Sequence, residues 1–260
     1  MGLGDIICAF GKAPAKHDDH DLKLAAVLVA GDPLPEAYDV DDKYKEIPTP
    51  PATYLNPPRD TCVIAGRAHQ TLRFELAEQG VLINITDEDI EREYRQQTGA
   101  GNSTIEVRPS LKLWRTRGWD AAGQHFKIKA FSKIDPIDPE AIKRAIHIHL
   151  GVGLGFQLPE SALTQFKAGE PWEVTRDRAA NHGHYVYVSG YTKPGPVCVT
   201  WGRKQQMSWA FVDKYCDEAW AIIDASETPE KKRNLDEKKI EEFLKTRAPV
   251  STEANRVPPQ

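Results

Sequence analysis

Two residues of this sequence, Cys62 and His184, have the types and positions of a nucleophile and its base. Cys62 stands at the start of a predicted helix, where unpaired main-chain N–H groups and the helix dipole favour a thiolate. His184 lies far along the chain at the start of a predicted strand. A thiolate that attacks a carbonyl carbon, with an imidazole that moves the proton, is the chemistry of cysteine hydrolases. The alternatives are a buried structural cysteine and a surface histidine, and His182 is a second candidate for the base.

The other motifs indicate neither a metal nor a cofactor. The run His182-Gly183-His184 could bind a metal, but no further ligand motif accompanies it. The glycines of residues 151–155 lack the G-x-G-x-x-G spacing and the Lys-Ser or Lys-Thr pair of phosphate loops. His69 lies seven residues after Cys62, about 10 Å away along a helix, which is too far for proton transfer. We therefore expect no metal site and no cofactor.

Helices are predicted mainly in the first half of the chain. Apolar residues at helical spacing predict a helix over residues 61–79, and Gly80 ends it. Thr86 with Asp89 three residues later resembles a capping box, and that helix ends near Gly99. Further helices are predicted over residues 110–116 and 139–150, and a short one within 22–29.

Strands are predicted mainly in the second half. Alternation of apolar and polar residues predicts strands over residues 126–131 and 185–191. Shorter apolar runs predict strands over residues 152–156, 196–201 and 219–223. Helices followed by strands indicate an α+β protein with a helical lobe and a sheet lobe.

The sequence divides into three parts by composition. Residues 1–50 form an irregular N-terminal extension that several prolines interrupt. Residues 51–225 carry the predicted helices and strands of the main domain. Residues 226–260 form a charged C-terminal tail with a short helix near residues 235–245 and a disordered end from residue 248. The tail is where we expect any contact with an assembly partner.

Composition excludes several classes of protein. The 260 residues have a net charge of −4, which does not favour a nucleic-acid partner. No apolar run approaches the roughly 20 residues that span a bilayer, so we expect no membrane partner. The start of the chain does not have the pattern of a signal peptide. The four cysteines lack C-x-x-C spacing, so we expect free thiols and a cytoplasmic location.

The residues around this pair resemble those of papain-like cysteine peptidases. That family has an oxyanion-donating Gln six residues before its nucleophile, and here Asn56 stands six residues before Cys62. The family's histidine is followed by Gly-Tyr six and seven residues later, as His184 is by Gly190 and Tyr191. The order of the predicted elements also matches, and the resemblance covers roughly residues 50–225.

The next family segment, Asn-Ser-Trp-Gly, corresponds to Val199-Thr200-Trp201-Gly202. The resemblance gives Trp201 the role of shielding the histidine, but Val199 replaces the asparagine that orients it. Thr200 is a candidate substitute. Neighbouring residues of a strand face opposite sides, so Thr200 can substitute only if the strand is shifted or bulged. Val63 also departs from the family, which usually has Trp after the nucleophile.

The resemblance implies a papain-like two-lobe fold, with an N-terminal helical lobe that carries the Cys helix and a C-terminal antiparallel β lobe. It implies hydrolysis of a peptide or related amide bond in a peptide or protein substrate. Cys62 would be the nucleophile, His184 the base and Asn56 an oxyanion donor. Retention of these three residues favours this interpretation.

The alternative function is a catalytically inactive papain-like fold that acts as a binding or structural module. The loss of the orienting asparagine at Val199 favours it. The sequence also looks like divergent papain-like proteins of bacteria and their phages, which carry Asn at the oxyanion position and a Cys helix that ends in Ala-His, as in Ala68-His69. If the protein is encoded by a phage, the resemblance implies a virion location instead of a cytoplasmic one.

Overall fold

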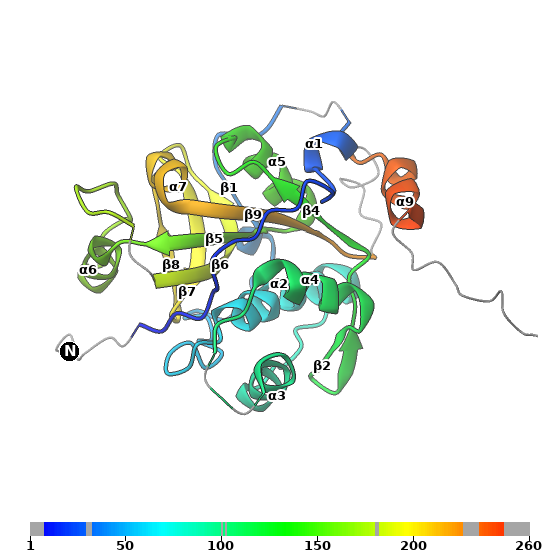
Figure 1. The fold of residues 1–260 in the computed structure, drawn as a ribbon, viewed down its shortest axis with the longest axis horizontal. Helices are drawn as coiled ribbons and strands as arrows, with labels where there is room; N and C mark the ends of the chain where they lie inside the picture. Colours follow the sequence, from blue (N-terminus) through cyan, green and yellow to red (C-terminus); the bar gives the residue numbers. More distant parts are fainter. Residues whose placement is uncertain are drawn as a thin grey trace, which may run out of the picture.

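The computed structural model describes residues 8–29, 33–99, 101, 103–179, 182–225 and 234–246. Its centre is a seven-stranded antiparallel sheet, and a group of helices from the first half of the chain lies beside it (Figure 1). The helices of this group are α2 (Cys62–Gln79), α3 (Asp87–Thr98) and α4 (Val107–Thr116). The helical part and the sheet-rich part follow each other in the chain, as the sequence predicts.

The sheet has the strand order β4-β9-β5-β6-β7-β8, and β1 pairs with β6 outside this path. Its strands are β1 (Tyr38–Asp39), β4 (Ala130–Ile134), β5 (Val152–Leu158), β6 (His182–Tyr191), β7 (Pro196–Thr200), β8 (Arg203–Gln206) and β9 (Cys216–Ile223). A separate hairpin contains β2 (Trp119–Ala121) and β3 (Gln124–Phe126).

The two main helix signals of the sequence are confirmed. Helix α2 begins at Cys62 and ends at Gly80, whose φ of 65° is a conformation that favours glycine. Helix α3 has the predicted capping box, in which the Thr86 side chain accepts from the Asp89 N–H and the Asp89 carboxylate accepts from the Thr86 N–H. Helix α5 (Pro139–His149) also agrees with its prediction, and its Asp138 cap accepts from the Ala141 N–H.

One predicted strand is wrong. The alternating run of residues 126–131 belongs to two strands, because β3 ends at Phe126 and β4 begins at Ala130. Strand β3 pairs with β2, whereas β4 pairs with β9. Ile128 in the link between them is buried while Lys127 is exposed, so the alternation of buried side chains continues although the ladder partner changes.

Several short elements carry no clear sequence signal. The predictions omitted α6 (Glu160–Ala168), α7 (Trp209–Tyr215), the 3-10 helix η1 (Val40–Lys43) and strand β8. Only four to nine residues long, they depend on tertiary contacts more than on their own periodicity. The short helix α1 (Leu24–Val27) lies within its predicted range, and α9 (Glu237–Thr246) agrees closely with the predicted tail helix. The predicted disordered end lies outside the described residues.

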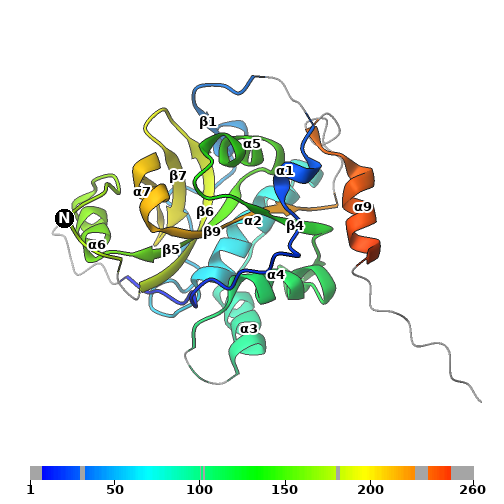
Figure 2. The same cartoon turned by 45° about the horizontal axis from the view of Figure 1, so that its top comes forward.

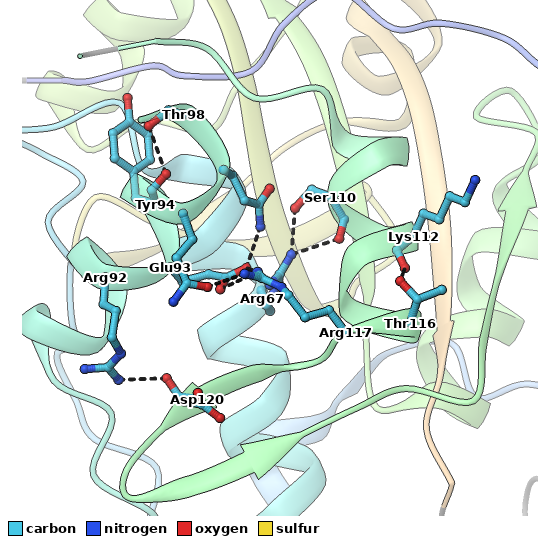
Figure 3. Close-up of polar contacts among 12 residues, drawn as sticks. Arg67, Arg92, Glu93, Tyr94, Thr98, Ser110, Lys112, Thr116, Arg117 and Asp120 are labelled. Carbon is cyan, nitrogen blue, oxygen red and sulfur yellow. Dashed lines mark hydrogen bonds and ion pairs between the residues drawn. The ribbon is translucent and has the colours of Figure 1, made fainter. Parts of the chain in front are cut away.

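A buried ion pair fixes the three helices of the helical part relative to one another. Arg67 of α2 donates to the Glu93 carboxylate of α3 at 2.7 Å (Figure 3). The same guanidinium donates to the main-chain oxygen and the hydroxyl of Ser110 in α4, at 3.0 and 2.6 Å. Arg117 adds a second cation to the Glu93 carboxylate at 2.6 Å. Because Arg67 is buried and Glu93 is its carboxylate partner, loss of Glu93 would leave a buried guanidinium without a counter-charge, whereas Glu93 itself keeps Arg117 if Arg67 is lost.

Helix α2 packs directly against β6, the strand that carries His184. A Cβ on Gly66 would lie 2.8 Å from the Tyr185 ring, so the absence of a side chain there lets the helix approach the strand. Most of α2 is buried, polar residues included. The helix with the candidate nucleophile therefore lies between the rest of the helical part and the sheet.

The N-terminal part of the chain is not separate from this domain. The segment of residues 8–13, hereafter the N-terminal segment, runs along the junction of the helical part and the sheet (Figures 1 and 2, dark blue) and hydrogen-bonds Gly183 on one side and Ile105 on the other. Further on, β1 adds to the sheet through β6. None of the helices in the described ranges has both the length and the apolar character that crossing a membrane requires.

Candidate active site

Cys62 is the first residue of α2, and the residue is only 1% exposed. Burial raises the pKa of the thiol to about 12. Hydrogen bonds from the main chain of Tyr185 and Val63, and the positive charge of Lys12, act in the opposite direction but are outweighed. Cys62 is therefore a protonated thiol at neutral pH in this state of the protein.

His184 is equally buried, and its ring is held on two sides. Its Nε2 lies 2.7 Å from the Thr200 hydroxyl, and its ring stacks on Trp201 with centroids 4.5 Å apart. Its Nδ1 is buried without a hydrogen-bond partner among the described residues. When the proton is on Nε2, this nitrogen donates to Thr200 and the Nδ1 lone pair stays available to accept a proton. Burial lowers the pKa of His184 to about 3, so the ring is neutral.

The structure brings the two candidate residues to the same part of the contact between α2 and β6. Tyr185, the next residue after His184, hydrogen-bonds Cys62 through its main chain. The thiol and the His184 ring nevertheless make no hydrogen bond with each other. Both groups are neutral, so no thiolate–imidazolium pair is formed in this state.

Thr200 reaches His184 through an irregularity of the sheet. The β6–β7 ladder pairs Val188 with Cys198 and then Gly190 with Val197, so Ser189 is an extra residue in β6. Without such a shift in register, strand alternation would turn Val199 and not Thr200 towards His184, as the sequence indicates. The structure therefore places a hydroxyl, and not the neighbouring Val199 side chain, at Nε2 of His184.

Asn56 lies buried in the loop before α2. Its side-chain amide donates to the main-chain oxygen of Arg59 at 2.9 Å and, over 3.4 Å, to that of Phe10. The first bond serves the local turn, while the second points at a carbonyl of the N-terminal segment. Asn56 thus combines the turn role with a donor directed at a peptide carbonyl beside the nucleophile helix.

The N-terminal segment covers the site through aromatic contacts. Phe10 stacks on His182 with centroids 4.5 Å apart and meets the rings of His184 and Trp201 edge-on at 6.1 and 6.2 Å. The indole N–H of Trp201 donates to the main-chain oxygen of Ala9 at 2.9 Å. The N-terminal segment therefore lies directly against the His184 ring and the Trp201 ring that stacks on it.

Main-chain hydrogen bonds hold the same segment to both sides of the site. The N–H groups of Gly11 and Lys12 donate to Gly183, at 3.2 and 3.0 Å. Ile105 donates to the Gly11 oxygen at 2.7 Å and accepts from Ala13 at 2.9 Å. Gly11 has a φ of 140°, and a Cβ there would lie 2.0 Å from the main-chain oxygen of Asp60. Only glycine fits this position while the segment is in place.

Sequence reasoning did not find this segment, because it treated residues 1–50 as an extension. Its partners Ile105, Asp60 and Gly183 are distant in sequence, and no local pattern marks them. A lysine beside a glycine, as in Gly11-Lys12, has the appearance of a solvated turn.

The remaining histidine candidates have other surroundings. His182 bonds the Glu160 carboxylate at 2.6 Å and its side chain is 32% exposed. His69 packs on Tyr54 at 4.8 Å, and burial lowers its pKa to about 3. Within the described ranges, no group of three or more His, Cys, Asp or Glu side chains is arranged to hold a metal ion.

Comparisons with known proteins identify the fold. No family model matches the sequence, and no curated protein matches it. A solved structure of xylellain, a cysteine protease from Xylella fastidiosa, superposes with a TM-score of 0.62 at 14% identity, covering 84% of this chain and 97% of that one. Procathepsin B from Trypanosoma congolense gives 0.59 at 13% identity, covering 84% and 87%. The proform of the ragweed pollen cysteine protease Amb a 11 gives 0.56 at 16% identity, covering 84% and 67%.

Proposed function

Because the chain has the fold of papain-like cysteine proteases, we propose that it is a cysteine hydrolase of peptide or related amide bonds, described here in a covered state. The observation that carries the proposal is the arrangement of His184. Its Nε2 is bonded to Thr200, while its Nδ1 has no hydrogen-bond partner among the described residues, on the strand that packs against the helix beginning at Cys62. This is the arrangement that a base needs in order to accept a proton from a thiol.

The reaction follows from the atoms of the site. His184 Nδ1 takes the thiol proton, and the Cys62 sulfur attacks the substrate carbonyl to form a C–S bond. The oxyanion accepts hydrogen bonds from the Asn56 amide and the Cys62 main-chain N–H. The C–N bond then breaks, and the leaving amine takes the proton from the imidazolium. Water, deprotonated by His184, hydrolyses the thioester to a carboxylic acid and restores the thiol.

The bond between Asn56 and Phe10 supports the assignment of the oxyanion donor. At 3.4 Å it is long, but it directs the carboxamide at a peptide carbonyl. A donor that already faces a carbonyl needs little reorganisation when a substrate carbonyl replaces it.

The N-terminal segment keeps the proposed enzyme latent. It excludes water from both reacting groups, and exclusion of water favours their neutral forms. Two of the structurally similar proteases are described as proforms, which supports a covered state as a normal state of this fold. Release of the segment would hydrate Cys62 and His184 and open the site to a substrate.

An inactive binding or structural module remains the second candidate. The absence of a thiol–imidazole hydrogen bond favours it, as does Val199 in place of the family's asparagine. For either function we propose a reducing cytoplasm, because all four cysteines are free.

Cleavage of a mixed peptide library tests the hydrolase proposal. Gly11→Val displaces the N-terminal segment, because the added side chain meets the Asp60 main chain. Gly101→Val is the matched control, since a Cβ there would meet only the Ser103 hydroxyl at 3.8 Å. We expect cleavage by Gly11→Val, little by Gly101→Val, and none when Cys62→Ala is added.

Hydrogen exchange at residues 8–13 shows whether the segment has left. If the segment is displaced, the domain stays folded and no peptide is cleaved, the inactive-module interpretation replaces the hydrolase proposal.

A further inference from the structure

Lys12 is a cation of the N-terminal segment whose side chain is fully buried. Its Nζ lies 2.8 Å from the Asp217 carboxylate and 3.1 Å from the Glu218 carboxylate, and it donates to the Ala13 oxygen at 3.0 Å. A lysine is rarely buried completely unless its charge is compensated. The two carboxylates of β9 provide that compensation.

The pocket around Lys12 is shaped for a long side chain. A Cβ on Gly155 of β5 would lie 2.3 Å from Cε of Lys12, so this glycine makes room for the aliphatic stem. Glu218 is held by the Trp220 indole N–H at 2.8 Å, and Asp217 by the Gln157 amide at 3.0 Å. The carboxylates are therefore fixed in place by other parts of the sheet and not by Lys12 alone.

The negative charge of the pocket favours a cationic occupant. Burial raises the pKa of Glu218, while the positive charge of Lys12 opposes that shift. An apolar or neutral occupant would leave the buried Glu218 carboxylate without a counter-charge, which is unfavourable.

Asp217 connects this pocket to a larger acidic cavity. Its side chain is 25% exposed and forms part of the lining of a cavity of about 550 Å³. Two lysines and a histidine also line that cavity, but acidic residues outnumber them; the acidic residues are Asp18, Asp19, Asp21, Asp135, Asp138 and Asp217. Arg108 neutralises part of the charge of Asp18 and Asp21. The cavity next to the pocket is therefore also acidic, which favours basic groups.

The pocket is also next to the proposed reacting groups. The Lys12 main-chain N–H donates to Gly183, which precedes His184 in β6. Ile105 pairs with the flanking residues Gly11 and Ala13, so the backbone on both sides of the occupant is held. A peptide that places a side chain in this pocket therefore has its backbone beside the catalytic residues.

We propose that the pocket formed by Gly155, Asp217 and Glu218 selects substrates by binding a Lys or Arg side chain, and that Lys12 occupies it in cis. This rests on the proposed hydrolase function. The substrate class is a peptide or protein segment with a basic residue near the cleaved bond. The alternative is that Lys12 only holds the N-terminal segment against the sheet and that the pocket binds no substrate side chain.

Binding of short peptides tests the pocket separately from catalysis. The probe is a fluorescently labelled peptide with the sequence of residues 9–13, Ala-Phe-Gly-Lys-Ala, and versions with Arg, Gln or Met in place of Lys. The receptor is the full chain with Gly11→Val, and anisotropy gives the dissociation constants. We expect the Lys and Arg peptides to bind about 10- to 100-fold more tightly than the Gln and Met peptides, because a buried charged hydrogen bond is lost.

Variants of the receptor show whether the carboxylates cause this preference. Glu218→Gln keeps an acceptor for Trp220 but removes the charge, so the preference should fall by about tenfold. Glu173→Gln, an exposed carboxylate elsewhere, is the matched control and should change nothing. Equal binding of the Lys and Met peptides, or a preference that survives Glu218→Gln combined with Asp217→Asn, would overturn the proposal.

Two further measurements keep the outcomes distinct. In the chain with Gly11 intact, Lys12→Gln should increase hydrogen exchange at residues 8–13, and no increase would count against a charged pocket. Cleavage of the peptide library without preference for basic residues would overturn the pocket and leave the hydrolase standing. Lysine-selective binding without any cleavage would support the pocket and overturn the hydrolase.

Discussion

Displacement of the N-terminal segment should make Cys62 much more reactive. The perturbation is Gly11→Val, which places a side chain where even a Cβ would lie 2.0 Å from the Asp60 main-chain oxygen. The segment must leave, because the clash is with backbone and not with a flexible side chain. The Cys62 thiol then gains water and loses the burial that raises its pKa to about 12.

The size of the effect follows from the thiol pKa. A fall from about 12 to the ordinary value near 8.5 raises the thiolate fraction at pH 7.5 by about 3,000-fold. The weaker base is also a poorer nucleophile, which removes about 1.5 of these 3.5 orders of magnitude. We therefore expect the alkylation rate of Cys62 to rise by about 100-fold, and by more if a hydrated His184 stabilises the thiolate.

The assay is a time course of iodoacetamide labelling at pH 7.5, with each cysteine quantified by peptide mass spectrometry. Cys198 is the internal control: it is fully buried in β7, and the contacts of the N-terminal segment do not include it. Its rate should stay unchanged. A Cys62 rate that changes less than about tenfold, with the segment shown by hydrogen exchange to have left, would refute the reasoning. Equal acceleration of Cys198 would indicate unfolding and would equally contradict it.

Four further predictions concern the uncovered chain or the fold. Asn56→Ala should lower kcat by about 10-fold or more with little change in KM, as expected for a lost oxyanion donor, measured with a cleaved library peptide. Thr200→Val should lower kcat, because no hydroxyl then holds the His184 ring, and Thr200→Asn should restore it in the same assay. Glu93→Met should lower the free energy of unfolding by about 3–5 kcal/mol, because the buried Arg67 guanidinium loses its carboxylate partner, measured by urea titration. Finally, acid should release the segment: the pKa of His184 is about 3 when covered and about 6.5 in water, so the covered state is fully favoured above about pH 6.5 and loses stability as pH falls towards 3. Hydrogen exchange at residues 8–13 across that range measures it, and exchange that is independent of pH would contradict it.

Local sequence signals were sufficient for the elements that carry the site. The start of α2 at Cys62 and the capping box at Thr86 depend on neighbouring residues, so their patterns predict them correctly. The alternation around residues 126–131 led to the wrong prediction of one strand, because alternation indicates which side chains are buried and not which strand is the pairing partner. Pairing is decided by distant residues of the chain.

The sequence showed that Thr200 could reach His184 only if a strand were shifted or bulged, but it did not show whether that irregularity occurs. The sequence shows a hydroxyl next to the position of the missing asparagine, but a shift in register depends on the whole β6–β7 ladder. Ser189, the extra residue, has no local signature of a bulge.

The covering segment and its acidic pocket could not be predicted at all. Lys12, Asp217 and Glu218 lie at opposite ends of the chain, and each alone has the appearance of a solvated charge. Only the fold places them together beside His184.

Detection of a thioester on Cys62 tests the central claim most directly. The uncovered chain, Gly11→Val, is mixed with a cleaved library peptide, quenched in acid within one turnover and analysed by intact and peptide mass spectrometry. The account predicts that Cys62 carries the acyl part of the peptide, that the amine part is released, and that Asn56→Ala reduces the adduct. A displaced segment with no adduct on Cys62, or cleavage that continues after Cys62→Ala, would contradict the assignment of Cys62 and His184 as the reacting pair.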